Sequence, residues 1–297
     1  MIERLLLLID AGNSSIKWKL ISDQEKKLLE IAQTPADHLN NEQVSAQALC
    51  MAWQAAIHAR SADPALSTQH LTLAWLCVGP LAVQTAVAQA FMALTGDKAS
   101  NPYQAQALIQ LHLSFPESSS HQTVTLNNRY DDPGQLGADR WVAALGLAAL
   151  GICKSGDQLL VISAGTATTA DLITCLGPHD LIFQGGWIIP GARLMHQSLF
   201  KNTRDLSYEW QEHESEFDAV PRASPQAIQQ GIAFAQVGWV EGLVRRHQIK
   251  MIVLSGGNAA FWKTALQHIG LDQITLLELP GLSFAGLAAL ATNQTAG

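Results

Sequence analysis

The chain has 297 residues, of which 48% are hydrophobic and 14% charged, and its formal net charge is −7 at pH 7. This composition is typical of a compact globular protein and excludes a largely disordered one. The length is enough for about two domains. The negative net charge gives no electrostatic basis for non-specific nucleic-acid binding, so we expect no nucleic-acid partner.

The sequence also indicates the cellular compartment. The apolar run that precedes Asp10 is too short for a secretory signal peptide, and no stretch approaches the roughly 18 continuous apolar residues of a membrane span. The four cysteines are widely spaced, without a Cys-x-x-Cys pair, which favours free thiols in a reducing compartment. They are Cys50, Cys77, Cys153 and Cys175. We therefore expect a cytoplasmic protein with no membrane partner.

The chain opens with a strand, a glycine turn and a second strand. An apolar run over residues 5–9 leads into residues 10–15, Asp-Ala-Gly-Asn-Ser-Ser, and a strand-like stretch over 16–21 follows. Because Gly12 has no Cβ, such a turn presents backbone N–H groups and small side chains to an anion.

Helices and strands then alternate, which favours an α/β architecture. Apolar spacing predicts the following elements: a helix over 44–60, a strand over 71–78, a helix over 81–94, a loop over 114–122 and a helix over 136–150.

The opening pattern returns in the middle of the chain. Residues 162–165, Ile-Ser-Ala-Gly, repeat residues 9–12, Ile-Asp-Ala-Gly, 153 positions later. Each copy lies between two strand-like runs, so two unrelated hairpins are one interpretation. The shared register favours two halves that face one another across a phosphate. That arrangement points to a nucleotide-handling enzyme.

The last third of the chain predicts a long helix over 225–248 and a strand over 251–254 that runs into Ser-Gly-Gly. Gly231 and Gly238 lie on the same face of this helix, seven residues apart. Since each glycine costs about 1 kcal/mol against alanine in a helix, we expect close packing there, against another helix or a flat ligand.

Four segments contain the glycine, hydroxyl and carboxylate residues that could bind a phosphate or take part in catalysis. They are residues 10–14 (Asp-Ala-Gly-Asn-Ser), 133–140 (Pro-Gly-Gln-Leu-Gly-Ala-Asp-Arg), 164–171 (Ala-Gly-Thr-Ala-Thr-Thr-Ala-Asp) and 185–191 (Gly-Gly-Trp-Ile-Ile-Pro-Gly). In this order and at these spacings they resemble the type III pantothenate kinases. The resemblance runs from residue 9 to about residue 258.

The resemblance implies an α/β fold of two duplicated actin-like ATPase (ribonuclease H-like) domains with a cleft between them. From the sequence we place these domains at residues 1–155 and 156–297. The resemblance also implies an obligate homodimer that uses ATP and Mg²⁺ to phosphorylate pantothenate, the first step of coenzyme A biosynthesis.

It further implies roles for individual residues, in a reaction where positioning and charge neutralisation dominate. Asp10 would hold Mg²⁺ through water, and Asp139, in the first helical turn, would be the catalytic base. ATP would contact Asp10, Gly12, Asn13, Ser14, Gly165, Thr166, Thr168, Gly256 and Gly257. Pantothenate would contact Tyr130, Gly137, Asp139, Arg140 and Thr203.

Structural roles remain open for several of these residues. Asp10 is also typical of a turn, Asp139 of a helix cap and Thr203 of a surface loop. The pair at 256–257 also fits a plain turn between a strand and a helix. Arg140 either contacts the substrate or pairs with a carboxylate across the dimer.

Ser163 departs from the family pattern. Family members commonly have aspartate there, and in several of them it helps to hold K⁺. A neutral hydroxyl is a weaker ligand, so a requirement for K⁺ or NH₄⁺ stays open, and Asp171 is an alternative source of charge. The same departure keeps a second function open, a catalytically weak relative that acts as a regulator or accessory factor, and the presence of both Asp10 and Asp139 argues against it. A third hypothesis is a kinase of the same fold for another small hydroxylated acid, which Tyr130 and the Leu-Gly-Ala-Asp-Arg segment at 136–140 disfavour.

Overall fold

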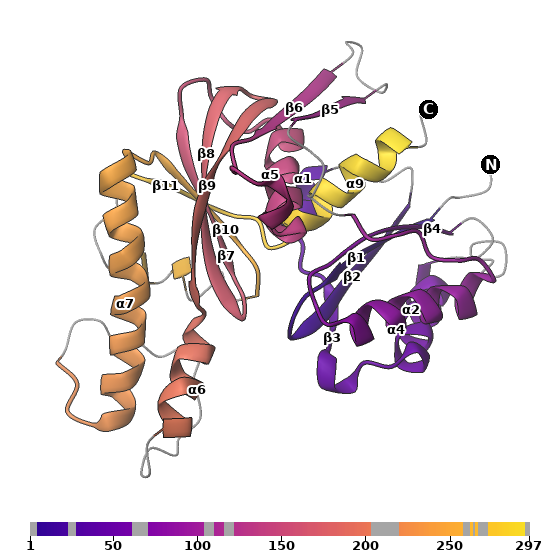
Figure 1. Ribbon diagram of the computed structural model, residues 1–297, viewed down its shortest axis with the longest axis horizontal. Coiled ribbons are helices and arrows are strands. Elements are labelled where there is room, and N and C mark those ends of the chain that lie inside the picture. The colour runs from indigo at the N-terminus through magenta and orange to yellow at the C-terminus, as the bar shows by residue number, and fades with distance from the viewer. Residues whose placement is uncertain are drawn as a thin grey trace. The chain divides into compact units, whose positions relative to one another are not determined.

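The computed structural model describes residues 5–22, 28–60, 71–103, 110–115, 122–202, 220–257, 262–263, 265–266 and 273–294 (Figure 1). The chain forms two compact units. Unit 1 comprises residues 1–152 and 281–297, and unit 2 comprises residues 153–280. From the sequence we expected a domain boundary between residues 155 and 156 and a continuous second domain. In the structure the C-terminal helix belongs to unit 1.

Unit 1 is built on a four-stranded sheet in the order β3-β2-β1-β4. Strands β1 and β2 form an antiparallel hairpin, β3 pairs antiparallel with β2, and β4 runs parallel to β1. The strands are β1 (Leu5–Ala11), β2 (Ser15–Ser22), β3 (Asp37–Asn40) and β4 (Leu71–Cys77). The unit also contains an antiparallel hairpin of β5 (Gln110–Phe115) and β6 (Gln122–Asn128).

Helices cover both faces of this sheet. They are α1 (Leu28–Gln33), α2 (Ala46–Arg60), α4 (Leu81–Thr95), α5 (Ala138–Leu150) and α9 (Leu282–Gln294), together with the short 3-10 helices η1 (Asn41–Gln43) and η3 (Pro133–Gln135). The loop expected over 114–122 is wrong at its ends, because residues 114–115 belong to β5 and residue 122 to β6. The remaining residues of that segment lie outside the described ones.

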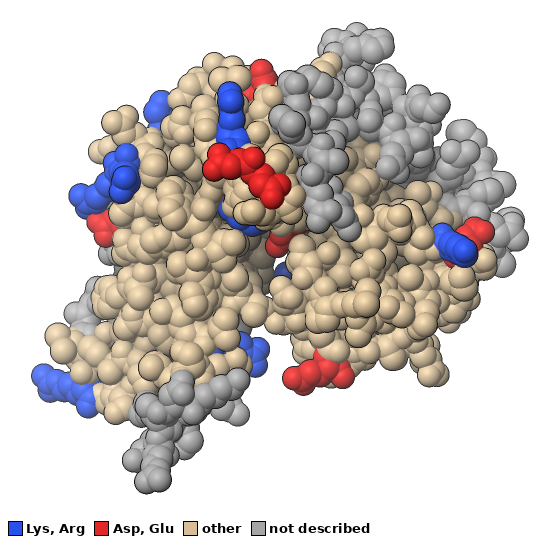
Figure 2. All heavy atoms as spheres, viewed as in Figure 1, with Lys and Arg blue, Asp and Glu red and all other residues tan. Residues whose placement is uncertain are grey.

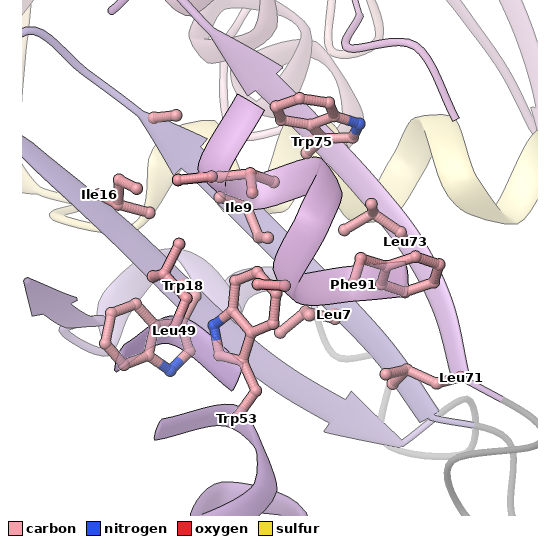
Figure 3. Packing of buried hydrophobic residues seen from close by; sticks show 14 of the residues in the cluster. Leu7, Ile9, Ile16, Trp18, Leu49, Trp53, Leu71, Leu73, Trp75 and Phe91 are labelled. Atoms are coloured by element: carbon pink, nitrogen blue, oxygen red, sulfur yellow. The ribbon is translucent and has the colours of Figure 1, made fainter. Parts of the chain in front are cut away.

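The alternating side chains of β1 explain why its sequence is apolar throughout. Leu7 and Ile9 pack with residues of α2 and α4 in one core cluster (Figure 3). Leu6 and Leu8 point to the opposite face and pack with residues of α5 and α9. A strand that is buried on both faces has no position for a polar residue until its end, where Asp10 lies.

Unit 2 has the strand order β11-β10-β7-β8-β9. Its strands are β7 (Gln158–Ala164), β8 (Ala167–Gly177), β9 (Asp180–Pro190), β10 (Met251–Ser255) and β11 (Thr275–Glu278), and its helices include α6 (Ala192–Asn202) and α7 (Ser224–His247). Leu160 and Ile162 of β7 form a buried cluster with Val237 and Val240 of α7. Helix α7 therefore covers one face of this sheet.

The two units share one strand order. In each, an antiparallel hairpin comes first, the third strand joins the outer side of the hairpin, and a later strand joins its first strand in parallel: β3-β2-β1-β4 and β9-β8-β7-β10. This confirms the duplicated α/β fold. The turns differ in length, since Ala11 pairs with Ile16 whereas Ala164 pairs with Thr168. The second turn is one residue shorter.

The cysteines, the helix lengths and the surface charge can also be described. All four cysteines are free thiols, and Cys153 and Cys175 are buried. Within the described ranges, no helix combines the length and apolarity that crossing a membrane requires. On the face drawn in Figure 2, the charged side chains of the described residues are scattered and do not gather into a basic patch.

Candidate active site

Asp10 lies at the end of β1, where the buried strand opens into the first glycine turn. It is partly exposed. The Ser283 hydroxyl, in the first turn of α9, donates a hydrogen bond of 3.0 Å to Asp10 Oδ2. The last helix of the chain therefore orients the carboxylate of its first strand.

The first glycine turn has a compact backbone with an exposed tip. The Gly12 N–H donates to the Ser15 carbonyl at 3.0 Å, while Asn13 and Ser14 are exposed. A Cβ at Gly79, in the segment after β4, would overlap the Gly12 carbonyl oxygen. Glycine at position 79 thus allows the backbone of that segment to pack directly against the backbone of the turn.

Asp139 lies in the first turn of α5, as the sequence predicts. Burial, followed by the nearby Asp10 carboxylate, raises the pKa of Asp139, and the Arg140 backbone N–H opposes this by favouring the ionised form. A Cβ on Gly137, the residue that precedes the helix, would lie 2.6 Å from Asp139 Oδ1. Gly137 therefore leaves the space that this carboxylate occupies.

Arg140 and Tyr130 lie together beside Asp139. The Arg140 guanidinium donates to the Tyr130 hydroxyl at 2.7 Å, and it also lies 5.6 Å from the centre of the tyrosine ring. Arg140 is only 5% exposed. The structure thus brings together in unit 1 the predicted residues at 10, 130, 137, 139 and 140.

Two glycines let α5 and α9 approach to backbone contact. A Cβ at Gly146 of α5 would overlap the Leu282 carbonyl oxygen, and one at Gly286 of α9 would overlap the Val142 carbonyl oxygen. This packing fixes the first turns of both helices, which carry Asp139 and Ser283. Sequence reasoning missed Ser283, because a serine near the start of a helix is common.

The second glycine turn, in unit 2, is braced by the fourth sequence motif. The Gly191 N–H donates to the Thr166 carbonyl at 2.9 Å, and a Cβ at Gly191 would overlap the Gly165 carbonyl oxygen. Gly165 and Thr166 themselves are exposed. Residues 185–191 thus support the turn from behind, as the segment containing Gly79 supports the first.

Gly256, directly after β10, lies against Ala164, the residue that precedes the same turn. Gly256 has a φ of +89°, and a Cβ there would lie 2.5 Å from the Ala164 carbonyl oxygen. Both the backbone conformation and the close approach require glycine. Gly257, the next residue, is exposed.

Thr168 is placed differently from the exposed residues of its turn. It is 2% exposed, and its hydroxyl donates to Gln236 Oε1 at 3.0 Å. The Gln236 amide in turn donates to the Pro190 carbonyl at 2.8 Å. The Thr168 side chain therefore joins the packing behind the turn.

Ser163 and Thr203 complete the predicted set. Ser163 is flanked in register by Thr169 of β8 and Ser255 of β10, so hydroxyl residues lie side by side on three neighbouring strands. Thr203 lies outside the described residues.

The carboxylates in unit 1 fit a magnesium ion. In the parts of the chain that the structure describes, no group of three or more His, Cys, Asp or Glu side chains could hold a metal. Asp10, which lies near enough to Asp139 to raise the pKa of Asp139, supplies few protein ligands. Mg²⁺ suits such a site, because it keeps several waters and takes further ligands from substrate phosphates.

The two α/β units share one strand order, and each has a glycine turn between its first two strands. The sequence family shows that this is the fold of a kinase. The chain belongs to the type III pantothenate kinase family, whose sequence model, described as "Type III pantothenate kinase", matches residues 6–246.

Two relatives with that description match nearly the whole chain, and a third matches more than half of it. The protein of Aromatoleum aromaticum (strain DSM 19018 / LMG 30748 / EbN1) is 32% identical over 94% of this chain and 96% of its own length. That of Herminiimonas arsenicoxydans is 29% identical over 97% and 100%. That of Azoarcus sp. (strain BH72) is 37% identical over 58% and 59%.

Among solved structures, the inorganic polyphosphate/ATP-glucomannokinase of Arthrobacter sp. strain KM is similar with a TM-score of 0.46 and 13% identity, covering 98% of this chain and 99% of that one. The fold assignment comes instead from the repeated strand order and the family match.

Proposed function

We propose that this protein transfers the γ-phosphate of ATP to the primary hydroxyl of pantothenate, which yields 4′-phosphopantothenate and ADP in the first step of coenzyme A biosynthesis. The observation that carries the proposal is the position of Asp139, in the first turn of α5 and under the influence of Asp10. The family match over residues 6–246 supports the choice of substrate.

Asp139 is the proposed catalytic base. The pantothenate hydroxyl oxygen forms a bond to the γ-phosphorus, the bond from that phosphorus to the bridging oxygen breaks, and ADP leaves. The hydroxyl proton passes to the Asp139 carboxylate. A raised pKa makes Asp139 a better proton acceptor than an ordinary aspartate, provided that it is ionised at the working pH.

Asp10 is the proposed magnesium ligand, acting through water. Magnesium, when bound, neutralises charge on the phosphates. Ser283 donates to Oδ2 of Asp10, so Oδ1 would be the oxygen that contacts the waters of a bound ion. A single protein carboxylate with an oriented second oxygen is consistent with an ion that retains most of its water.

The two glycine turns are the proposed phosphate loops. Gly12, Asn13 and Ser14 form the first, and Gly165 and Thr166 form the second; both turns are accessible to an anion. Thr168, part of the predicted set, supports the second turn through Gln236. For the adenosine, we propose a position against the backbone of Gly256 and Gly257, which carry no side chains of their own.

Pantothenate is proposed to lie beside Tyr130, Gly137 and Arg140. Arg140 and Tyr130 are hydrogen-bonded to one another beside Asp139. The guanidinium group of Arg140 suits a substrate that carries a carboxylate. Thr203 is proposed to reach pantothenate from the neighbouring subunit of the dimer.

A homodimer is part of the proposal. Apolar side chains remain exposed on the two packed helices of unit 2, with Leu194 and Leu199 on α6 at 41% and 39% and Phe234 on α7 at 48%. Exposed apolar side chains on neighbouring helices are typical of a surface that another subunit covers. The free thiols favour a cytoplasmic location, and we propose no nucleic-acid or membrane partner.

The side chains around Ser163 are candidate ligands for a monovalent cation. Ser163 would contribute a neutral hydroxyl, and Thr169 and Ser255 add two more at the same level of the sheet. Oxygen ligands of this kind hold K⁺ or NH₄⁺ more weakly than a carboxylate does. We therefore propose at most a weak dependence, which a Ser163→Asp substitution should strengthen.

Mass spectrometry of the product tests the proposed substrate. Purified protein is incubated with ATP, Mg²⁺ and a mixture of pantothenate and other small hydroxylated acids, with and without K⁺. Phosphorylation of pantothenate alone is expected. Preferential phosphorylation of another acid would favour a different kinase. The accessory-factor alternative is not favoured, because a binding module has no need for both Asp10 and Asp139.

A further inference from the structure

We infer that Asn41 is a positioning residue for the nucleotide phosphates. It holds the carbonyl groups of the first glycine turn on one side, so that the N–H groups of Asn13 and Ser14 point to the other side. This inference rests on the proposed function, in which that turn is a phosphate loop. Asn41 belongs to none of the sequence motifs and lies at the start of η1, directly after β3.

Asn41 contacts the carbonyl groups of Gly12, Asn13 and Ser14, the three residues between β1 and β2. Its side-chain Nδ2 donates to the Gly12 carbonyl at 3.1 Å and to the Asn13 carbonyl at 2.8 Å. Its backbone N–H donates to the Ser14 carbonyl at 2.9 Å. One residue thus holds three successive carbonyl oxygens on the same side of the turn.

The geometry of the peptide bond determines where the N–H groups of the turn point. The described peptide bonds are all trans, and in a trans peptide the C=O group and the following N–H group point in opposite directions. The carbonyls of Gly12 and Asn13 point toward Asn41, so the N–H groups of Asn13 and Ser14 point away from it. Successive N–H groups on one side of a turn form an anion-binding concavity.

The chemistry of the side chain leaves no alternative to an amide nitrogen. A group between two carbonyl oxygens must supply two donors, which the NH₂ of asparagine does and its oxygen does not. The remaining Oδ1 of Asn41 is buried and has no hydrogen-bond partner among the described residues. An unsatisfied buried acceptor disfavours the folded state. Both donors of the side-chain amide are thus used to hold the turn.

Nucleotide affinity in an Asn41→Ala variant tests the inference. Isothermal titration calorimetry with ADP and with a non-hydrolysable ATP analogue, both with Mg²⁺, measures phosphate binding without relying on turnover. We expect affinity to fall about tenfold, as for the loss of one to two net hydrogen bonds. In the kinase assay we expect KM for ATP to rise by a similar factor, while KM for pantothenate stays within about twofold.

The neighbouring Asn40 provides a matched control. It is exposed and its side chain makes no cap hydrogen bond, so Asn40→Ala should bind ADP like the wild type. Asn41→Asp should bind ADP more weakly than Asn41→Ala, because its carboxylate faces two carbonyl oxygens and repels the phosphates.

The possible outcomes separate the inference from its alternatives. If Asn41→Ala does not fold, Asn41→Ser, which keeps one donor, carries the test with a smaller loss of ADP affinity. Wild-type ADP affinity in either folded variant would overturn the inference, as would a loss of kcat with unchanged KM for ATP. Wild-type protein that binds ADP but does not phosphorylate pantothenate would instead refute the proposed function, while the calorimetric comparison would still report on Asn41.

Discussion

The hydroxyl of Ser283 donates to the carboxylate of Asp10 at 3.0 Å, across a sequence separation of 273 residues. The contact joins the end of the first strand to the first turn of the last helix, and both belong to unit 1. It fixes one oxygen of the proposed magnesium ligand. The C-terminal helix therefore contributes to the proposed site, although no sequence motif includes it.

Ser283→Ala should weaken the response to Mg²⁺. Without its donor, the Asp10 carboxylate is free to rotate, and loss of such supporting contacts typically reduces metal affinity about tenfold or more. The Mg²⁺ concentration for half-maximal activity should rise accordingly, and Mn²⁺ binding, followed by electron paramagnetic resonance in the presence of ADP, should weaken in parallel.

Ser283→Thr is the matched control, since it keeps the hydroxyl and should restore most of the Mg²⁺ response. A Ser283→Ala enzyme with the metal dependence of the wild type would show that the hydrogen bond does not position Asp10.

Asp139→Asn should remove activity and stabilise the fold. As the proposed base, Asp139 contributes about 10²–10⁴-fold to kcat. Its pKa is raised in the folded state by burial and by Asp10, so its ionisation opposes folding, and stability falls as the pH rises through the folded pKa. The variant should therefore unfold at higher temperature than the wild type at neutral pH, and the difference should shrink as the pH falls toward the ordinary aspartate pKa.

Differential scanning fluorimetry over a pH series measures this difference, and the kinase assay measures turnover. Near-wild-type kcat in the folded variant would rule out Asp139 as the base. A melting temperature that falls at neutral pH would contradict the electrostatic account of this carboxylate.

Gly286→Ala should destabilise the protein, because its new Cβ would overlap the Val142 carbonyl oxygen and separate α9 from α5. Overpacking of this kind costs about 1–3 kcal/mol. In contrast, the matched substitution Gly242→Ala on α7 meets no described atom within 4 Å, and it should add about 0.5–1 kcal/mol to the free energy of unfolding.

Urea denaturation of both variants gives the two changes in unfolding free energy. Changes of the same sign would indicate that backbone contact between α5 and α9 does not limit the size of residue 286.

Lys19 should give the wild type a pH-dependent stability above neutrality. This buried lysine of β2 donates to the carbonyls of Ile31 and Thr34 at the end of α1, and burial lowers the pKa of Lys19 from 10.5 to about 8. Between these values the unfolded chain binds more protons than the folded one, so stability rises with pH. Lys19→Met should lack this rise.

The free energy of unfolding is measured in urea at several pH values from 8 to 10.5. Relative to that of Lys19→Met, the value for the wild type should rise as the pH rises. Parallel pH profiles for the two proteins would show that the lysine titrates as it does in the unfolded chain.

Local patterns predicted the fold well. Apolar runs with glycine turns predicted both hairpins, and their repetition predicted the duplication that the strand orders confirm. Helical spacing placed the helices that begin near residues 44, 81, 136 and 225 to within two residues at their starts. These features depend on neighbours in the sequence, which is why one chain is enough to find them.

Contacts between distant segments were not predictable in the same way. The roles of Asn41 and Ser283 follow from tertiary packing, and nothing in the residues beside them indicates the partner. Burial of Thr168 depends on Gln236, 68 residues away. A Cβ added at Gly231 or Gly238 would meet no described atom within 4 Å, so close packing against another helix is not found there within the described part of the chain. Packing of these glycines against a flat ligand stays a prediction.

Phosphorus nuclear magnetic resonance of one reaction tests the central claim most directly. Purified wild-type protein and Asp139→Asn are each incubated with ATP, Mg²⁺ and pantothenate, and the spectrum is followed with time. The wild type should produce ADP and the phosphomonoester of pantothenate in equal amounts, and the variant should produce almost none. A folded wild-type protein that forms no phosphomonoester, or equal formation by both proteins, would contradict the account.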